Sequence, residues 1–312
     1  MSPRIRTTLA ALTLAALAAT GAGCSNTETT ESTAKAAEKA GIGTGGREKA
    51  EAVETDPDVQ ALVPASIVDA GVLTVVTDPT YAPMEFTDDK GDIIGLDPDI
   101  AVAVAHKMGV EAKFEKGDFN GIIAGIEAGR YDASWASFSV TPERQQKVDM
   151  VSYVNSGTSV LVPHGNPDEI AAITDLCGKT VAAQTGNTQV LTTLPAFQKD
   201  CADAGLAKIT ELVLPQQDNV NQAVSTGRAD ALLADGALTA YYAQLQPDAF
   251  SQVDDIFVEP ALLGAITKKD TGLAAAIEAA VNSLIEDGTY ADLLEAWGLS
   301  AAEIDASGVN QG

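Results

Sequence analysis

The sequence predicts an α/β protein made of two lobes, each with a β-sheet flanked by helices. Of its 312 residues, 46% are hydrophobic, which suffices to bury the cores of one or two domains and excludes wholesale disorder. Segments with strand character alternate with segments of helical periodicity along most of the chain. A unit of amphipathic helix, glycine and short strand also occurs twice, ending at residues 128–133 and again at 226–231. This repetition favours two lobes of similar build.

The net charge and the composition limit the partners that the protein can have. A formal net charge of -25 and a pI near 4.2 would repel a phosphate backbone, so we expect no nucleic-acid partner. Only 5% of the residues are aromatic. After residue 20 no apolar run approaches the roughly 20 residues that cross a bilayer, which argues against an integral channel. Small polar solutes remain as partners.

Residues 1–24 have the pattern of an export signal. Two arginines precede an apolar stretch at residues 9–19, and small residues stand directly before Cys24. This pattern resembles a lipoprotein signal, in which a peptidase cuts before the cysteine and the sulfur carries diacylglycerol. Gly21 stands where such signals usually carry Leu, and the alternative is cleavage near Ala22 and free secretion. We expect a lipid anchor on Cys24 at the extracytoplasmic face of the cell membrane.

The two ends of the folded body are predicted to be loose. Residues 25–64 are mainly Ser, Thr, Glu, Lys, Ala and Gly, and such a composition offers little apolar burial to offset the entropy of ordering. We expect a disordered tether there, with the folded body starting near Ala65. Residues 305–312 are expected to form a loose tail.

Cys177 and Cys201 remain once Cys24 is assigned to the lipid. An even number of cysteines in an oxidising compartment favours a disulfide. The alternative, thiolate catalysis, requires a cationic or His neighbour. His164 is the nearest His in sequence, but a Gly-Asn-Pro turn separates it from Cys177. We therefore expect the disulfide.

The elements follow one another in a regular order. Gly129 and Gly227 each end the helix of a repeated unit, because glycine adopts the left-handed conformation that closes a helix. Strands are predicted at residues 73–77, 110–114, 132–137, 180–183 and 230–234. Helices are predicted at residues 98–108, 188–197, 273–285 and 290–297.

Residues 88–92 are rich in aspartate and lie between two short apolar segments. A calcium-binding loop needs alternating acidic residues and a terminal Glu at a fixed spacing, and this segment lacks both. The alternative is a turn between strands at residues 85–86 and 93–94. We expect the hairpin and no metal site.

Polar side chains stand at the ends of several predicted strands. In sheets flanked by helices, ligands bind beyond the carboxyl ends of the strands. A solvated strand end is polar as well, so no single one of these residues identifies a site. Their recurrence at several strand ends predicts a ligand site that contains Asp78, Ser137, Ser139, residues 184–188 and Asp235.

Arg144 follows a predicted helix start. Thr141 is a suitable N-cap and Pro142 suits the first helical position. The start of a helix presents free backbone N–H groups, and the planar guanidinium of Arg144 adds a fork of donors. Together they predict a carboxylate site. The alternative is a surface arginine that makes a cap or a salt bridge.

Several segments together resemble a known family. The order and spacing of these segments are similar to the extracytoplasmic amino-acid-binding proteins of ABC transporters, solute-binding protein family 3. The resemblance runs from about Leu73 to Gly298. It rests on residues 78–86, 95–100, 118–123, 141–144, 184–188, 227–235 and 286–290.

The resemblance implies a two-lobed periplasmic-binding-protein-like fold with a hinge and a ligand cleft. The chain is expected to cross between the lobes near residues 156–159 and again near 254–260. Lobe 1 would comprise residues 65–157 plus 259–304, and lobe 2 would comprise residues 158–258.

The resemblance also implies how an amino acid would be held by its backbone groups. Arg144 would pair with the ligand α-carboxylate, helped by Ser139 and Thr188. Asp235, from the opposite lobe, would take the α-ammonium. Burying a zwitterion costs several kcal/mol per charge unless each end meets an opposite charge and hydrogen bonds. One arginine and one aspartate answer that need.

The remaining site residues are implied to contact the ligand side chain. Tyr81 and Phe119 would sandwich it. Its head group would meet Asp78, Ser137 and Gln184. Glutamine, glutamate, cationic and other polar amino acids all remain open as ligands at this point.

The resemblance predicts a monomeric lipoprotein that delivers a polar amino acid to an ABC permease. One alternative is a ligand sensor that docks on a membrane receptor and uses the same cleft. Another is a dehydratase-like enzyme of this fold, but catalysis needs a placed acid or base, and the chain has only two histidines. A metal-dependent adhesin would need more than residues 88–92. We expect no catalytic residue, no metal and no cofactor.

Overall fold

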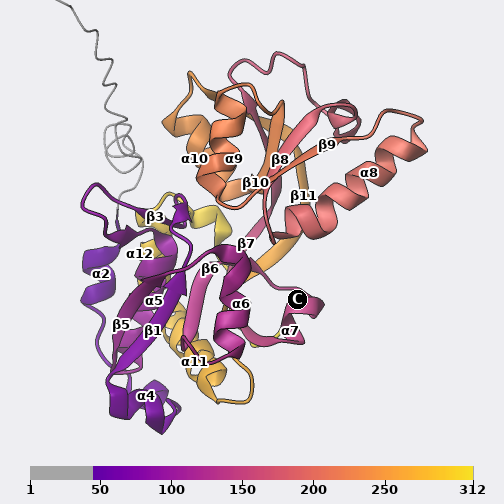
Figure 1. The fold of residues 1–312 in the computed structure, drawn as a ribbon. Helices are drawn as coiled ribbons and strands as arrows, with labels where there is room; N and C mark the ends of the chain where they lie inside the picture. The colour runs from indigo at the N-terminus through magenta and orange to yellow at the C-terminus, as the bar shows by residue number, and fades with distance from the viewer. Residues whose placement is uncertain (1–44, 312) are drawn as a thin grey trace, which may run out of the picture. The chain divides into compact units, whose positions relative to one another are not determined.

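An eight-stranded sheet organises residues 45–311, the part of the chain that the structure, a computed structural model, describes (Figure 1). The strand order is β5-β1-β6-β11-β7-β10-β8-β9. The strands are β1 (Val72–Thr77), β5 (Glu111–Lys116), β6 (Ala133–Ser139), β7 (Val148–Pro163), β8 (Thr180–Gln184), β9 (Thr210–Leu214), β10 (Ala231–Asp235) and β11 (Phe250–Lys268).

The sheet has two parallel parts joined by two long antiparallel strands. β1 pairs in parallel with β5 and β6, and β8 pairs in parallel with β9 and β10. β7 and β11 pair with each other antiparallel and run from one part to the other. The segments in which the chain is expected to cross between lobes, 156–159 and 254–260, lie inside these two strands.

Helices cover each part of the sheet, so that the α/β architecture predicted from the sequence is confirmed. We call the β5-β1-β6 part with its helices lobe 1 and the β10-β8-β9 part with its helices lobe 2. Lobe 1 carries α5 (Leu96–Lys107), α6 (Phe119–Glu127), α11 (Leu273–Glu286) and α12 (Thr289–Ala296). Lobe 2 carries α8 (Leu194–Asp203), α9 (Gln217–Ser225) and α10 (Gly236–Leu245).

The repeated unit of helix, glycine and strand has the same build in both lobes. Gly129 follows α6 with φ 68°, and Gly227 follows α9 with φ 72°. Both angles lie in the left-handed region that glycine adopts at little cost. β6 and β10 then enter the sheet, each beside a parallel neighbour. The predicted helix-glycine-strand repeat is confirmed.

Lobe 1 also contains a small three-stranded sheet. It is built from β2 (Thr80–Tyr81), β3 (Glu85–Thr87) and β4 (Ile93–Ile94). Asp88 closes the turn between β3 and β4, because its Oδ1 accepts from the backbone N–H groups of Lys90 at 2.8 Å and Asp92 at 2.9 Å. The predicted hairpin is confirmed.

The predicted tether is wrong for residues 45–64, which are folded onto lobe 1. They include α2 (Arg47–Glu51) and α3 (Pro57–Gln60), and Ala50 is fully buried. The buried Asp99 carboxylate fixes this segment: it accepts from Gly46 N at 2.9 Å and from Arg47 Nε at 2.8 Å. One buried charge with several donors thus orders a segment that is poor in apolar residues.

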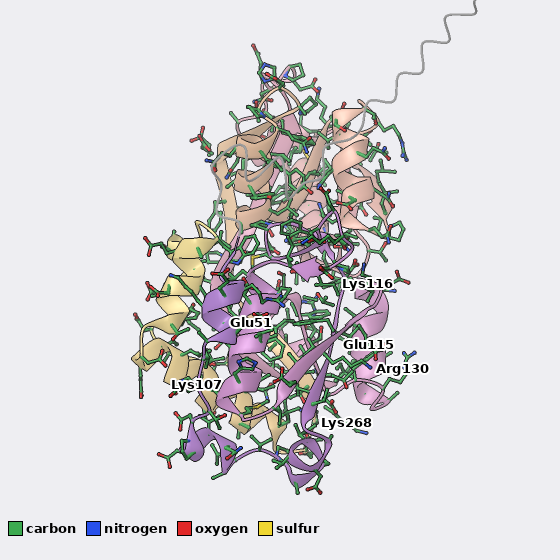
Figure 2. The ribbon with its side chains drawn as sticks, turned by 90° about the vertical axis from the view of Figure 1, so that its left-hand side faces the viewer. Glu51, Lys107, Glu115, Lys116, Arg130 and Lys268 are labelled. Carbon is green, nitrogen blue, oxygen red and sulfur yellow. A yellow bond between two sulfur atoms is a disulfide. The ribbon has the colours of Figure 1, made fainter. Side chains whose placement is uncertain are left out.

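Further polar contacts hold this N-terminal segment in place. Asp56 N donates to the Lys107 carbonyl at 3.0 Å, and Ser283 Oγ donates to Asp56 Oδ2 at 2.7 Å. Lys107 pairs with Asp287, the residue that follows α11, at 2.7 Å. Figure 2 labels Lys107 and Glu51 among the charged side chains of lobe 1. A short helix α4 (Ala65–Ala70) then leads into β1.

The loose tail predicted at residues 305–312 is wrong for residues 305–311. Ser307 is buried, and Val309 forms a β-bridge with Val151. Asn310 bonds to Met150 twice: its N–H donates to the carbonyl at 2.7 Å, and its Oδ1 accepts from the backbone N–H at 2.9 Å. The tail lies along β7, and these partners, distant in sequence, replace the apolar burial that it lacks.

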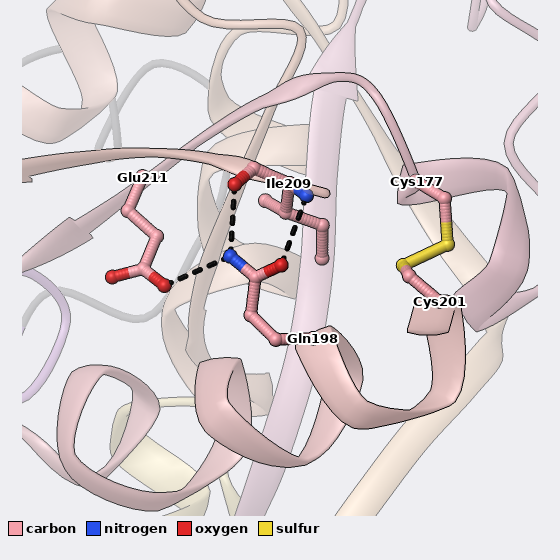
Figure 3. The surroundings of a disulfide bond; sticks show 5 residues. All are labelled: Cys177, Gln198, Cys201, Ile209 and Glu211. Atoms are coloured by element: carbon pink, nitrogen blue, oxygen red, sulfur yellow. Dashed lines mark hydrogen bonds between the residues drawn. A yellow bond between two sulfur atoms is a disulfide. The ribbon is translucent and has the colours of Figure 1, made fainter. Parts of the chain in front are cut away.

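The predicted disulfide between Cys177 and Cys201 is confirmed, with the two Cα atoms 5.6 Å apart (Figure 3). It joins α8 to the segment before β8. One turn earlier on α8, Gln198 accepts from Ile209 N at 3.1 Å and donates to the Ile209 carbonyl at 2.8 Å. The disulfide and these hydrogen bonds together fasten α8 to the rest of lobe 2.

The predicted signal at residues 1–24, Cys24 and the tether up to residue 44 lie outside the described residues, as does residue 312. Across 45–311, none of the helices has the length and apolar character needed to span a bilayer.

Candidate functional site

One small cavity between the lobes gathers the predicted ligand-binding residues, with the exception of Asp78. The space not filled by protein atoms is about 270 Å³, open solvent included. Lobe 1 contributes residues from β2, α6, β6 and the short helix α7 (Pro142–Gln145), and lobe 2 contributes residues that follow β8 and end β10. The lining residues are Tyr81, Phe119, Ala136, Ser137, Ser139, Arg144, Gln184, Asn187, Thr188, Gln189 and Asp235.

Arg144 reaches this cavity from the predicted helix start. Thr141 caps α7, since its Oγ1 accepts from Arg144 N at 3.3 Å. The guanidinium donates to the Ser139 carbonyl at 2.8 Å and to the Gly186 carbonyl of lobe 2 at 3.1 Å. Only 6% of Arg144 is exposed, so the alternative of a surface arginine is wrong.

Two aromatic rings lie beside the guanidinium. The Arg144 carbon Cζ is 5.7 Å from the centre of the Phe119 ring and 5.1 Å from that of Phe138. The two rings stack on each other with centroids 4.4 Å apart. They supply cation–π attraction but no negative charge. Burial lowers the pKa of Arg144 to about 10, and the negative charge of Asp235 acts in the opposite direction.

Asp235 faces the same cavity from lobe 2, at the junction of β10 and α10. Its Oδ2 accepts from the Tyr81 hydroxyl of lobe 1 at 2.8 Å, and its Oδ1 accepts from Gln189 Nε2 at 3.4 Å. Tyr81 in turn accepts from Asp235 N at 2.9 Å. Burial raises the pKa of Asp235 to about 6, although the hydrogen bond from Tyr81 opposes this shift.

Arg144 and Asp235 are therefore two buried, opposite charges on opposite lobes. Within the described part of the chain, neither has an oppositely charged group within the 4.0 Å of an ion pair. Burial lowers the pKa of Arg144 and raises the pKa of Asp235, so it favours the uncharged form of each group. A solute with a carboxylate and an ammonium group would supply the missing charge at each end.

Ser139 and Thr188 meet across the cleft next to Arg144. Their hydroxyl oxygens are 3.0 Å apart. Ser139 ends β6 in lobe 1, and Thr188 precedes a short π-helical turn, Gln189–Thr193, that continues into α8. The helix predicted at residues 188–197 thus starts as a wider turn, which brings residues 187–189 toward the cavity.

Asp78 lies behind the cavity, at the end where the ligand side chain is predicted. Gln184 Nε2 of lobe 2 donates to Asp78 Oδ2 at 3.0 Å, and Phe119 N donates to the same oxygen at 3.1 Å. Asp78 lines a neighbouring cavity together with Asp118 and Asp218. Burial raises the pKa of Asp78, and burial together with the charge of Asp78 raises the pKa of Asp218 to about 6.

Ser137 occupies a different environment from the other predicted residues. It lines the cavity, but its hydroxyl donates to the buried Glu85 Oε2 at 3.2 Å. Its backbone has φ 51°, in the left-handed region. The structure thus places Ser137 between the cleft and a buried carboxyl group.

Gln189 is a lining residue that the sequence did not single out, and Asn187 lies inside the predicted segment 184–188 but was assigned no role of its own. Gln189 Nε2 donates to Thr158 Oγ1 at 3.0 Å as well as to Asp235. The Nδ2 of Asn187 is buried and has no hydrogen-bond partner among the described residues. Both flank Thr188, so their position beside a predicted contact was the available signal. Their orientation depends on the π-helical turn, which local sequence does not reveal.

Comparisons with known proteins identify the family of the chain. Residues 73–300 match the family described as bacterial extracellular solute-binding proteins, family 3. The arginine-binding protein ArgT of Corynebacterium glutamicum is 29% identical over 255 residues, which cover 82% of this chain and 83% of that protein.

Two solved structures are similar in fold and sequence. An ancestral arginine-binding protein bound to arginine has a TM-score of 0.66 and 31% identity, and the match covers 73% of this chain and 98% of that one. An ancestral amino acid-binding protein that is a precursor of cyclohexadienyl dehydratase has a TM-score of 0.64 and 33% identity, with 74% and 97% covered. This protein therefore belongs to the bacterial extracellular solute-binding proteins, family 3, and is an extracytoplasmic solute-binding protein with their two-lobed fold.

Proposed function

We propose that this protein captures a polar amino acid in the cleft between its lobes and delivers it to an ABC permease, while a lipid on Cys24 anchors it to the membrane. The observation that carries the proposal is the pair of buried, opposite charges, Arg144 and Asp235, that face one cavity from opposite lobes. The protein acts as a monomer and does no chemistry on its ligand.

The zwitterion of an amino acid is complementary to this pair. Its carboxylate would accept hydrogen bonds from the guanidinium of Arg144, which in this structure donates to two carbonyl groups. Its ammonium would take Asp235, which now accepts only from neutral donors. A bond between two opposite charges adds a Coulomb attraction that a carbonyl or hydroxyl partner does not supply. The exchange favours the ligand.

The side chain of the ligand would be cationic. Asp78, Asp118 and Asp218 line the neighbouring cavity together with Lys116, and burial, followed by the negative charge of Asp78, raises the pKa of Asp218. A guanidinium or ammonium group would relieve this repulsion. The arginine-binding protein of C. glutamicum and the ancestral arginine-binding protein support the same ligand class.

Closure of the lobes would be the signal that the permease reads. The cross-lobe contacts include Tyr81 with Asp235, Ser139 with Thr188, and Arg144 with Gly186. A ligand that touches both lobes adds contacts that only the closed arrangement provides, so it shifts the population toward closure.

Isothermal titration of the purified protein with each common amino acid tests the proposal. We expect arginine to bind with the highest affinity, and Arg144→Ala to weaken it by about a hundredfold or more because a buried carboxylate would lose its partner. The matched control is Arg130→Ala, which removes an exposed arginine of lobe 1. Equal affinity in the two variants would contradict the proposal.

Two further measurements address turnover and anchoring. Mass spectrometry of arginine after prolonged incubation with the protein should return it unchanged; a product would support an enzyme instead. The mature protein should carry the mass of a lipid at Cys24 and lose it in Cys24→Ala. A secreted, unlipidated wild type would contradict the anchor but not the binding function.

A further inference from the structure

A buried cluster beneath the cleft joins four elements of lobe 1. It consists of Glu85 on β3, Asp97 on α5, Ser137 on β6 and Tyr153 on β7. Asp97 Oδ2 accepts from the Tyr153 hydroxyl at 2.7 Å and from Ser137 N at 2.9 Å. Glu85 Oε2 accepts from Ser137 Oγ at 3.2 Å. Neither acid touches the cavity itself.

The burial and the closeness of the two carboxyl groups favour a proton on one of them. Glu85 is 1% exposed and Asp97 is fully buried. Asp97 Oδ1 has no hydrogen-bond donor among the described residues, and the Ser137 hydroxyl lies 3.2 Å from Glu85 Oε2 and 3.5 Å from Asp97 Oδ2, so the two buried carboxyl groups are adjacent. One of them therefore carries the proton. Because Asp97 Oδ2 already accepts from two strong donors, Asp97 is the ionised member and Glu85 the protonated one.

Burial and charge agree with a shared proton. Burial raises the pKa of Asp97 to about 7, against the hydrogen bonds from Tyr153 and Ser137. Burial, followed by the negative charge of Asp97, raises the pKa of Glu85 well above its usual range. The other titratable groups that face the pair are Asp78, Tyr81 and Tyr153. None of these is a cation, so a proton is the available countercharge.

The cluster determines the conformation of Ser137 at the floor of the cleft. A non-glycine residue at φ 51° costs roughly 1–2 kcal/mol and persists only when its surroundings hold it. Here Asp97 holds the backbone N–H and Glu85 holds the hydroxyl. Ala136 and Ser139, on either side along β6, line the same cavity. Movement at Ser137 would displace both.

We propose that Glu85 and Asp97 are positioning residues for ligand binding, which share one proton beneath the cleft and thereby hold Ser137 in its left-handed conformation. The inference rests on the proposed function, because it assumes that the cavity binds an amino acid. When the proton leaves at alkaline pH, two adjacent buried carboxylates repel each other and Ser137 loses its fixed partner. Affinity then falls.

Titration with arginine between pH 6 and pH 9 tests this proposal, using the wild type, Glu85→Gln, Glu85→Ala and the exposed control Glu286→Gln. A glutamine at position 85 donates permanently to Asp97, whereas an alanine leaves Asp97 Oδ1 unpaired. We expect Glu85→Ala to bind about tenfold more weakly at pH 7, because an unsatisfied buried group costs about 1–3 kcal/mol. Glu85→Gln should recover most of that loss.

The pH profile distinguishes positioning from a merely structural role. The affinity of the wild type should fall several-fold relative to Glu85→Gln as the pH rises from 7 to 9. Titration of arginine itself is common to both proteins and cancels in the ratio. Parallel profiles for the wild type and Glu85→Gln, or equal losses in Glu85→Gln and Glu85→Ala, would overturn the proposal.

A ligand-free measurement separates this inference from the proposed function. The raised pKa values mean that the folded protein holds a proton that the unfolded chain releases near pH 4 to 5, so the free energy of unfolding falls as pH rises above that range. Glu85→Gln should flatten this fall. It should also keep wild-type amide exchange in residues 133–140 at pH 7, whereas Glu85→Ala should accelerate it. If no amino acid binds the wild type, the proposed function fails, and these two results alone confirm or overturn the shared proton and the hold on Ser137.

Discussion

The two ends of the cleft differ in the arrangement of their charged side chains. At one end, Arg144 and Asp235 carry opposite charges and come from opposite lobes. At the other end, three acids, Asp78, Asp118 and Asp218, line one cavity together with Lys116. The first arrangement matches the backbone groups that all amino acids share. The second, in which acids outnumber the lysine, favours a positive side chain.

The difference separates class recognition from selection within the class. Opposite charges on the two lobes stabilise the closed state around any zwitterion. The cluster of aspartates stabilises only ligands with certain side chains. Loss of the first arrangement should therefore remove binding altogether, and loss of the second should change the preference. Each prediction below tests one side of this comparison.

The largest effect is expected for Asp235→Asn. Asparagine keeps the size and most hydrogen bonds of Asp235 but removes the charge that would meet the ligand ammonium. We expect affinity for every amino acid to fall by about a hundredfold, since truncating one partner of a buried charge pair costs about 2–5 kcal/mol. Titration calorimetry with arginine and with glutamine measures it. A loss for arginine alone would break the comparison, because Asp235 would then select side chains.

A smaller and selective effect is expected for Asp78→Asn. The amide can still bond Gln184 and Phe119 but carries no negative charge. The ratio of arginine affinity to glutamine affinity should fall by about tenfold, the size of one charge-assisted hydrogen bond. Competition between the two ligands measures the ratio. If both affinities fall equally, Asp78 holds the cleft together and does not select.

The smallest effect is the pH dependence of the wild type on the acidic side. Asp235 binds an ammonium group only when it is ionised, and burial raises its pKa to about 6. As the pH falls from 7 to 5.5, affinity should fall about fourfold, because roughly a quarter of Asp235 is ionised at pH 5.5. With arginine the fall should be steeper than in Asp78→Asn, because Asp78 and Asp218 titrate as well. A flat profile would show that Asp235 ionises normally.

Much of the fold could be predicted because local patterns and tertiary environment agree. The sequence predicts a helix at 273–285 and the structure has α11 at Leu273–Glu286; the strand predicted at 73–77 is β1, Val72–Thr77. The long strands β7 and β11 are harder to see. Their burial pattern changes where they pass from one lobe to the other, as at residues 155–156, so no single period describes them.

The folded ends escaped prediction because their partners are distant in sequence. Gly46 and Arg47 depend on Asp99, and Asn310 depends on Met150. For the site, strand ends and a helix start identified most of the residues that line the cavity, and the family resemblance added Tyr81 and Phe119. Burial of Glu85 had no such signal, since a charged residue is rarely buried and its neighbour Asp97 lies across a hairpin. Only the assembled fold reveals that pair.

The pairing of β7 with β11 continues from one lobe into the other. Irregularities in their register occur between Val253 and Phe257 and between Val258 and Ala261, where the strands pass between the lobes. We therefore expect the cleft to open by bending of this two-stranded ribbon and not by movement about a flexible linker. The stiffness of that ribbon should affect the release rate of every ligand equally. Substitutions within it would therefore change how long a solute stays bound without changing which solute is preferred.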